Sequence, residues 1–388
     1  MLGALAGDFI GSRFERCPPG MTDFDLIAPS CKFTDDSVLT VATAEALMGD
    51  GDFASAYRRW ARRYPRAGYG ASFFRWAQSD DLGAYQSWGN GGAMRVSPVA
   101  YCWEDDGSAS AGVTHDHPHG TDGARAVVSA IRLALAGIER GAIERYLRAQ
   151  YAGLRWKVRE FPEMDLRAQT TAPTALLQAL SSNSWEDAIR RSVALGGDVD
   201  TVACMAGALA EALYGGVPPE IAAQVESQLP DDMRTVYDGF NVRWGRPGRG
   251  GPISGPQIPP ELREIYEATV IEIESPDGRL VLSCSDPAPQ ILLPESWVIT
   301  GCNPRSEPID DAANRGRNRA LEEIITASGF PWYPAVGRDR NGQWSEESFS
   351  VVGTPRELVL RWGRCLGQLG VFRVGGETNG VEVVGCWE

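Results

Sequence analysis

Residues 195–214 read LGGDVDTVACMAGALAEALY, and the organisation of the whole chain can be worked out from this stretch. Two glycines lead into a pair of carboxylates, Asp198 and Asp200, and an Ala-rich segment from Val202 to Leu213 follows them. Small side chains let helices pack closely, and an apolar helix flanked by glycines belongs in an interior. We therefore expect a buried helix that carries two aspartates at its N-terminal end.

A second acidic run, Thr34-Asp35-Asp36-Ser37, leads into the apolar stretch SVLTVATAEALM at residues 37–48. A helix start needs only one side-chain oxygen as its N-cap, and aspartates there also complement the helix dipole. A solvated helix end therefore explains this run equally well when it is considered alone. Two such runs in one chain shift the balance toward a shared role.

Carboxylates that are desolvated at the ends of interior helices are costly unless a cation neutralises them. Asp and Thr offer only oxygen ligands, which suit Mg²⁺, Mn²⁺ or Ca²⁺ and not zinc. We expect the two distant runs to meet in one pocket, where they could hold two ions about 3.5–4 Å apart.

The overall charge and length exclude some classes of protein. A chain of 388 residues suggests two or three domains with a sizeable core. The net charge of −14 argues against a surface that coats nucleic acid, although a local basic patch stays open. Lys32 and Lys157 are the only lysines, so anion recognition falls to arginines or backbone amides.

The cysteine pattern and the hydropathy point to a cytoplasmic protein. The eight cysteines are dispersed and none forms a CxxC pair, which favours reduced thiols. No run reaches the ~18 apolar residues of a membrane span. The first eight residues lack the basic start of a signal peptide, and Asp8 interrupts them.

Periodicity divides the chain into two domains. Up to residue 244 the pattern is helical, so we expect a compact all-α domain at 1–244. Residues 245–260 (GRPGRGGPISGPQIPP) form a Gly/Pro-rich linker, and a smaller α+β domain is expected at 261–388. The helices expected in the first domain lie at 37–48, 53–64, 121–137, 174–180, 184–195 and 201–214. The second domain is expected to hold strands at 269–274, 279–283, 297–300, 348–352, 371–374 and 381–384, with helices at 312–328 and 356–366.

Three further segments carry chemistry. In Ser87-Trp88-Gly89-Asn90-Gly91-Gly92 the glycines let a backbone approach a ligand and present its amides, and Trp88 could stack on a base; an ordinary glycine-rich loop is the simpler alternative.

In the segment 3–15 (GALAGDFIGSRFE), Asp8 and Glu15 lie seven residues apart, which places them on one face of a helix. The alternative is a buried packing helix with Asp8 as a hydrogen-bonded cap. All three histidines fall in residues 114–119, in a Pro-containing loop that fits no common zinc pattern, and His115 is the one expected to face a ligand.

Taken together, these segments resemble the ADP-ribosylglycohydrolase family over roughly residues 1–245. Several separate motifs in family order are much more specific than any one of them. The resemblance implies an all-α bundle with a binuclear Mg²⁺ or Mn²⁺ centre in a cleft. The segments that carry it are GALAGDFIGSRFE (3–15), FTDDS (33–37), SWGNGGAMRVSPVAY (87–101), THDHP (114–118) and GGDVDTVACMAGALAEALYG (196–215).

The resemblance also implies residue roles. Glu15 would act near the scissile ribose, with Asp35 and Asp198 as further catalytic carboxylates. Trp88 stands where a Tyr is often found, so stacking would be kept. The metal ligands would be Thr34, Asp35, Asp36, Asp198, Asp200 and Thr201. The residues in contact with ADP-ribose would be Ser87, Trp88, Gly89, Asn90, Gly91 and His115.

The C-terminal region, roughly 262–388, resembles a bacterial domain of unknown function of the DUF3293 type. The resemblance is carried by Trp297-Val298-Ile299-Thr300, by Asn303-Pro304-Arg305-Ser306 and by the stretch 344–348, and it implies no activity. The Asn/Arg-rich stretch 303–319 could bind a phosphate or a protein partner, and a solvent-facing helix and loop is the alternative.

The expected function is metal-dependent hydrolysis of the N- or O-glycosidic bond between ADP-ribose and a modified acceptor, with a protein side chain as the first choice. The cofactor would be two Mg²⁺ ions, with Mn²⁺ as an alternative. Two other functions stay open: hydrolysis of O-acetyl-ADP-ribose or another small ADP-ribose derivative, and ADP-ribose binding without turnover. The sequence leaves the acceptor linkage, the target and the oligomeric state undetermined.

Overall fold

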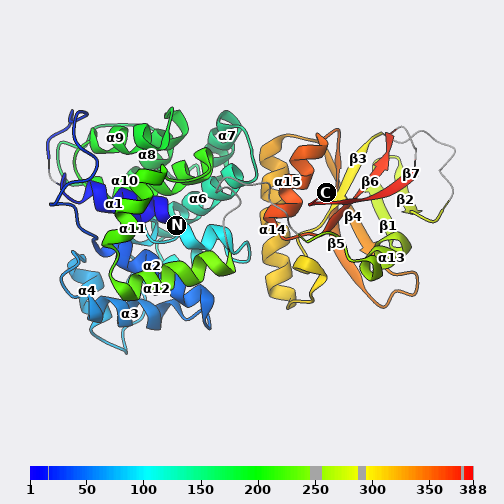
Figure 1. The fold of residues 1–388 in the computed structure, drawn as a ribbon, viewed down its shortest axis with the longest axis horizontal. Helices are drawn as coiled ribbons and strands as arrows, with labels where there is room; N and C mark the ends of the chain where they lie inside the picture. The colour runs from blue at the N-terminus through cyan, green and yellow to red at the C-terminus, as the bar shows by residue number, and fades with distance from the viewer. Residues whose placement is uncertain (16, 245–255, 287–293, 377–379, 388) are drawn as a thin grey trace. The chain divides into compact units, whose positions relative to one another are not determined.

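The computed structural model describes residues 1–15, 17–244, 256–286, 294–376 and 380–387. Contacts divide the chain into two compact units, one made of Met1–Ala134 with Arg140–Gly250 and the other of Leu135–Glu139 with Gly251–Glu388 (Figure 1). Most of the expected linker, residues 245–255, lies outside the described residues. The domain limits at 244 and 261 therefore stay a prediction.

In the described part of the first unit the regular secondary structure is all helical, with no β-strand and one isolated bridge between Gly89 and Arg167. This confirms the all-α expectation. Its helices are α1 (Leu2–Gly11), α2 (Asp35–Met48), α3 (Phe53–Arg63), α4 (Ala71–Ala77), α5 (Ser108–Gly112), α6 (Pro118–Leu135), α7 (Arg140–Gln150), α8 (Ala168–Ser181), α9 (Trp185–Val193), α10 (Val199–Tyr214), α11 (Pro219–Gln228) and α12 (Asp231–Arg243), with the 3₁₀ turns η1 (Asn90–Gly92) and η2 (Ser97–Tyr101).

Helices α1 and α10 form the centre of this unit and lie side by side in antiparallel directions (Figure 1). Every residue of α1 is buried, as is α10 from Val199 to Ala212. A Cβ on Gly7 would lie 2.1 Å from the carbonyl oxygen of Ala203, and one on Gly11 would lie 2.7 Å from Cα of Asp200. The two backbones are therefore in direct contact, which brings the start of α10 against the end of α1.

Two expectations about the helix ends are corrected. Helix α2 begins at Asp35, so the acidic run is its first turn, and Thr34 is the N-cap whose hydroxyl accepts from the Asp36 amide. Helix α1 ends at Gly11, so Glu15 lies in the turn beyond it. The argument that placed Asp8 and Glu15 on one helical face is therefore wrong.

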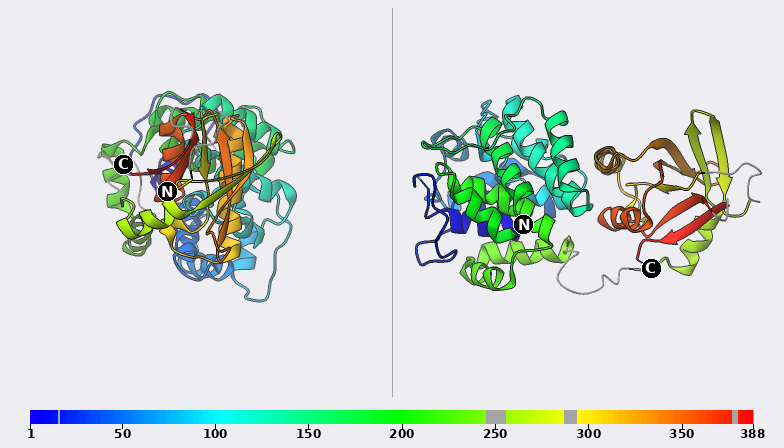
Figure 2. Two further views of the ribbon diagram at one scale, coloured as in Figure 1. Left: turned by 90° about the vertical axis from the view of Figure 1, so that its right-hand side faces the viewer. Right: turned by 90° about the horizontal axis from the view of Figure 1, so that it is seen from above.

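The second unit is built on one antiparallel sheet of seven strands in the order β2-β1-β4-β5-β3-β6-β7, which confirms the α+β expectation. Helices α14 and α15 lie on the same side of this sheet (Figures 1 and 2). The sequence did not predict β4 or α13. The elements are α13 (Pro260–Ala268), β1 (Val270–Ser275), β2 (Gly278–Ser283), β3 (Ser296–Ile299), η3 (Pro304–Ser306), α14 (Asp311–Ser328), β4 (Trp332–Arg338), β5 (Ser345–Val352), α15 (Arg356–Cys365), β6 (Gly370–Gly375) and β7 (Gly380–Gly385).

The Asn/Arg-rich stretch of the second unit hydrogen-bonds to its own fold. Arg317 is buried and donates through Nε to the Gly301 carbonyl at 2.9 Å. The Asn318 side chain accepts from the Gly301 amide at 2.7 Å and donates to the Glu347 carbonyl at 3.0 Å. These contacts hold the end of β3 against α14, which is a structural use of the residues.

No helix in the described part of the chain is long and apolar enough to cross a membrane. All eight cysteines are free, as their dispersed spacing predicted.

The close contact of α1 with α10 gives a first prediction. Gly7→Ala should lower the free energy of unfolding by about 3 kcal/mol or more, because the new Cβ would overlap a carbonyl oxygen that belongs to a packed helix. Urea denaturation would measure this.

Gly112→Ala is the matched control, since Gly112 is also helical and its Cβ would meet nothing within 4 Å. Equal stability of the two variants would show that the helices can separate without loss.

Candidate metal centre

Three buried carboxylates from three different helices converge inside the first unit. Asp8 of α1, Asp36 of α2 and Asp200 of α10 each offer one oxygen, and these oxygens all lie within 4.8 Å of one another. The structure thus brings together the two acidic runs, as the sequence predicted. It adds Asp8, which the sequence had paired with Glu15 on one helical face, with a packing residue or a cap as the alternative.

Asp8 holds the first turn of α2 in place. Its Oδ2 accepts from the backbone amides of Thr34 at 2.9 Å and Ser37 at 3.1 Å, and its Oδ1 accepts from the Thr34 hydroxyl at 2.6 Å. Asp8 is therefore a hydrogen-bonded cap, although the helix that it caps is α2 and not its own. Three donors already satisfy this carboxylate.

Asp36 is the member whose hydrogen bonding is incomplete. Its Oδ2 accepts from the Thr201 hydroxyl at 3.2 Å. Its Oδ1 is buried and has no hydrogen-bond partner among the described residues. A buried carboxylate oxygen without a donor is costly, and it fits the ligand set of a hard cation.

Asp35 and Asp198 flank the three converging carboxylates. The Asp35 amide donates to the Ala67 carbonyl at 3.0 Å, and its side chain is half-buried beside Gly68. Asp198 is buried, and its Oδ2 accepts from Nδ2 of Asn90 at 2.6 Å.

Burial and mutual repulsion raise the pKa of all five aspartates. Burial is the first cause for each, and the charges of the neighbouring carboxylates add to it. The pKa of Asp8 rises to about 7 and that of Asp198 to about 8. No arginine or lysine is among the charges that shift these values. The cluster therefore needs protons or a cation to become neutral.

Glu15 comes close to this cluster even though it lies outside α1. Its charge is among the causes that raise the pKa of Asp198 and Asp200. The prediction that Glu15 acts beside the acidic centre is thus compatible with the structure, although the argument that placed it on the same helical face as Asp8 was wrong.

The loop 87–92 joins the acidic cluster to the surface. Trp88 is 59% exposed, and its ring and the His117 ring pack edge to face with their centroids 5.9 Å apart. The Gly89 amide donates to Oγ of Ser87 at 3.2 Å, and the Asn90 amide donates to the Leu166 carbonyl at 2.8 Å. Since the Asn90 side chain also binds Asp198, the conformation of this loop is tied to the acidic cluster.

His115 lies under this loop and not on its surface. It is buried, and a Cβ on Gly91 would come within 3.1 Å of its ring. Its Nδ1 is 2.7 Å from the Thr114 hydroxyl. Burial, then the charge of Arg95, hold the pKa of His115 well below its usual value, so the ring is neutral near pH 7. His115 supports the glycines from below in this structure.

Sequence reasoning did not find Tyr69. Its hydroxyl is buried without a hydrogen-bond partner among the described residues. Burial first, and then the charge of Asp35, raise the pKa of this phenol, which places it near the acidic cluster. The signal in the sequence is weak, since Gly68-Tyr69-Gly70 follows an ordinary turn.

The chain is similar in sequence to two described families and to known ADP-ribosylhydrolases. A sequence model described as ADP-ribosylglycohydrolase matches residues 1–246, and one described as a protein of unknown function, DUF3293, matches residues 299–371. The ADP-ribosylhydrolase ARH3 of Danio rerio is 25% identical over 329 residues, covering 61% of this chain and 89% of that protein. The ADP-ribosylarginine hydrolase Tri1 of Pseudomonas putida (strain GB-1) is 28% identical over 278 residues, covering 58% of this chain and 72% of that protein.

One solved structure, titled "ADP-ribosylglycohydrolase-related protein complex", is similar to this chain with a TM-score of 0.50 and 26% identity. The match covers 63% of this chain and 97% of the other. The helical unit thus has the fold of that protein.

The raised pKa values predict how stability depends on pH when a chelator is present. In the folded chain Asp8 and Asp198 keep their protons up to about neutral pH. In the unfolded chain the same carboxyl groups have a pKa of about 3.9 and release them. Their stabilising contribution is complete below about pH 4 and is lost as pH rises through about 7 and 8. In EDTA, the Tm should therefore fall between about pH 6.5 and about pH 8.5, a window that lies above the titration of unfolded histidine.

Millimolar Mg²⁺ or Mn²⁺ should reduce this fall, because a bound cation replaces the protons. Differential scanning calorimetry would measure it. A Tm that does not depend on pH in EDTA, or that metal leaves unchanged, would contradict the reading of the cluster as an uncompensated acidic site.

Proposed function

The chain belongs to the ADP-ribosylglycohydrolase family, and we propose that it is a metal-dependent hydrolase that cleaves the glycosidic bond between ADP-ribose and a modified acceptor, releasing ADP-ribose. The observation that carries this proposal is the convergence of Asp8, Asp36 and Asp200, together with the unpartnered Oδ1 of Asp36. The proposed catalytic domain is 1–244. The acceptor is a protein side chain in this proposal, and its linkage is the first quantity to measure.

The donor set fits one or two hard divalent cations, for which we propose Mg²⁺, with Mn²⁺ as the alternative. Asp8 is outside the proposed ligand set, since three donors already occupy it and its work is to hold the first turn of α2. When bound, the cation would supply positive charge that polarises the ribose hydroxyls and activates water. The proposed ligands are Thr34, Asp35, Asp36, Asp198, Asp200 and Thr201.

Glu15 is proposed to transfer protons during the reaction, and Asn90 to favour the ionised form of Asp198. The Glu15 carboxylate would accept a proton from the attacking water and return it to the leaving acceptor atom. The Asn90 amide donates to Oδ2 of Asp198, which lowers the pKa of that carboxyl against the effect of burial and so favours the ionised form. Asp35 and Asp198 are thus proposed as catalytic carboxylates as well as ligands.

The loop 87–92 is the proposed binding surface for the substrate. Trp88 is exposed and its ring lies roughly perpendicular to that of His117, which leaves exposed indole surface for stacking on a base. Ser87 and Gly89 shape the turn, and Gly91 lies on the neutral His115. These contacts support a pre-formed loop in which Ser87, Trp88, Gly89, Asn90, Gly91 and His115 serve the substrate.

The first test removes single charges from the centre. Asp36→Asn and Asp198→Asn should each lower the rate of ADP-ribose release at least ~1,000-fold, because each loses a carboxylate at the centre, while thermal unfolding in EDTA stays cooperative. Mass spectrometry of products from Arg-, Ser- and acyl-linked ADP-ribosyl conjugates, with and without EDTA, measures both activity and linkage.

Asp238→Asn is the matched control, because Asp238 is an exposed aspartate of α12. Turnover retained in both site variants would contradict a catalytic role for the centre. Absence of turnover in the unaltered chain on every conjugate, with tight ADP-ribose binding, would leave only binding without catalysis.

A second test concerns the stacking surface. Trp88→Ala should weaken ADP-ribose binding about 10-fold, because one base–aromatic stack contributes about 1–3 kcal/mol. Trp88→Phe should keep most of the affinity. Isothermal titration calorimetry would measure both.

Phe74→Ala removes another exposed aromatic residue of the same unit and should have no effect. Equal affinities for all three variants would show that Trp88 does not meet the base.

A further inference from the structure

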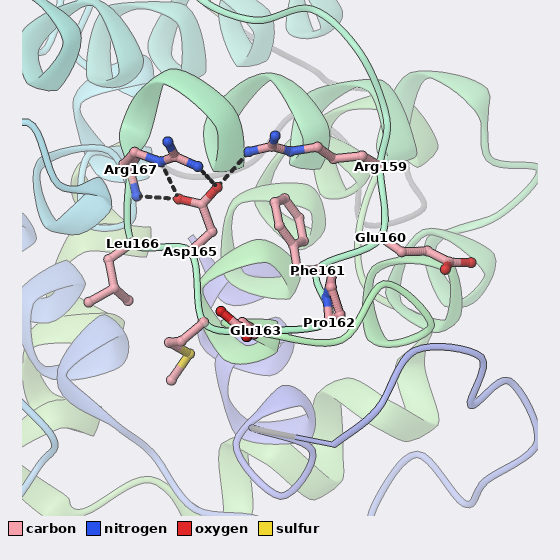
Figure 3. Close-up of a pocket in the computed structure, with 9 residues that line it drawn as sticks. Arg159, Glu160, Phe161, Pro162, Glu163, Asp165, Leu166 and Arg167 are labelled. Carbon is pink, nitrogen blue, oxygen red and sulfur yellow. Dashed lines mark hydrogen bonds and ion pairs between the residues drawn. The ribbon is translucent and has the colours of Figure 1, made fainter.

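The segment 159–167 contacts both the residues that precede Asp198 and the proposed substrate loop. The Phe161 amide donates to the Leu195 carbonyl at 2.7 Å, and a Cβ on Gly197, the residue before Asp198, would meet Phe161. At its other end the segment pairs with the loop 87–92, through the Leu166 carbonyl and the bridge between Gly89 and Arg167. The nine residues of this segment line a cavity of about 490 Å³ (Figure 3).

Two arginines in this cavity share one carboxylate. In Figure 3 the guanidinium groups of Arg159 and Arg167 approach Asp165 from opposite sides. Arg159 donates through one terminal nitrogen at 2.6 Å, and Arg167 donates through Nε and a terminal nitrogen at 2.8 Å each. Asp165 also accepts from the Arg167 amide at 3.1 Å and from the Thr170 hydroxyl at 2.8 Å.

The cluster of Arg159, Asp165 and Arg167 carries a net positive charge. Burial alone would raise the pKa of Asp165, but hydrogen bonds from Arg167 and Thr170 hold it at about 2, so one carboxylate faces two guanidinium groups near neutral pH. The carboxylate side chain is only 9% exposed, whereas those of Arg159 and Arg167 are 37% and 48% exposed. The remaining N–H groups of the two arginines have no protein acceptor among the described residues, so they can bind a solvent-borne anion.

Three features make a phosphate the ligand that suits this cluster. The guanidinium fork matches phosphate oxygens. Helix α8 begins directly after Arg167, and its N-terminal dipole adds positive potential. The loop 87–92 has already used two of its amides, those of Gly89 and Asn90, for its own hydrogen bonds, so a phosphate beside that loop needs donors from elsewhere.

We propose that Arg159 and Arg167, oriented by Asp165, form a phosphate-binding subsite of the substrate cleft. This rests on the proposed function in that the phosphate belongs to an ADP-ribosyl compound. Two sources fit the same chemistry: the diphosphate of ADP-ribose, or a phosphate ester on its adenosine ribose. The lining of this cavity also includes Glu160 and Glu163, so the positive charge is local to the exposed edges of the two guanidinium groups.

The alternative is that the two arginines only clasp the segment to α8. The two explanations predict different effects of salt. Salt screens the attraction between the arginines and a phosphate, whereas it does not alter a loss of affinity that comes from a distorted loop. They also differ in ligand dependence, because a distorted loop would weaken binding of the uncharged nucleoside as well.

The experiment measures binding to the full chain by calorimetry at about 50 mM and about 500 mM NaCl, with ADP-ribose, ADP-ribose 2′-phosphate and adenosine as probes. Arg159→Gln and Arg167→Gln should each weaken binding of a phosphate-bearing probe about 10-fold at low salt and less at high salt. Adenosine binding should not change. Arg155→Gln is the matched control, since Arg155 is an exposed arginine of the preceding segment outside the cluster.

The two phosphate-bearing probes show which phosphate the subsite binds, the diphosphate or the phosphate ester. An equal loss for both phosphate-bearing probes assigns the subsite to the diphosphate, and a loss confined to ADP-ribose 2′-phosphate assigns it to the ester. Affinities as high as that of Arg155→Gln, or a loss that is the same at both salt concentrations or extends to adenosine, would overturn the proposal.

Failure of the proposed function gives a different result. In that case the unaltered chain would release no ADP-ribose from any conjugate, while phosphate-bearing probes would still bind and respond to Arg159 and Arg167. Turnover with no response to either arginine would leave the proposed function standing and remove only the subsite.

Discussion

Repulsion among carboxylates in a buried space is the constraint on which this structure depends. Asp8, Asp36 and Asp200 place oxygens within 4.8 Å of one another, and Asp35 and Asp198 add charge at the edge. No arginine or lysine is among the main causes that shift their pKa values, so the described residues give them no strong positive partner. Such a cluster is neutralised either by bound protons, which it keeps up to about neutral pH, or by a cation.

The contact between α1 and α10 is what forces the carboxylates together. Glycines at positions 3, 7 and 11 let the backbone of α1 touch that of α10 along its length, and any Cβ there would overlap atoms of the facing helix. This fixes the distance between Asp8 and Asp200, while the hydrogen bonds that Asp8 accepts from the amides of Thr34 and Ser37 hold Asp36 in place. Repulsion between these carboxylates would push two surface helices apart. Here the close packing of the two helices resists it, because a densely packed interior cannot expand gradually.

The sequence predicted those parts of the molecule that depend on local pattern. The acidic ends of α2 and α10 and the strands β1, β2 and β5 to β7 follow from capping residues and periodicity. The strand β4 was missed because Pro334 interrupts its pattern. Glu15 was wrongly placed on a helix with Asp8 because α1 ends at Gly11. Tyr69 was missed because the charge beside it, that of Asp35, lies in a distant segment. Arg159 and Arg167 were missed because their segment contacts the loop 87–92 and Gly197, which are far away in the sequence.

Asn90 connects the deep and the outer parts of the site. Its side chain donates to Asp198, and its backbone amide donates to the carbonyl of Leu166, the residue before Arg167. Asn90 thus links Asp198 of the acidic cluster to the segment that carries Arg167. A ligand that moves this loop must therefore move the donor of Asp198 too, and the same donor lowers the pKa of that carboxyl. The Asn90 amide side chain is therefore one contact through which the outer loop and the buried centre touch.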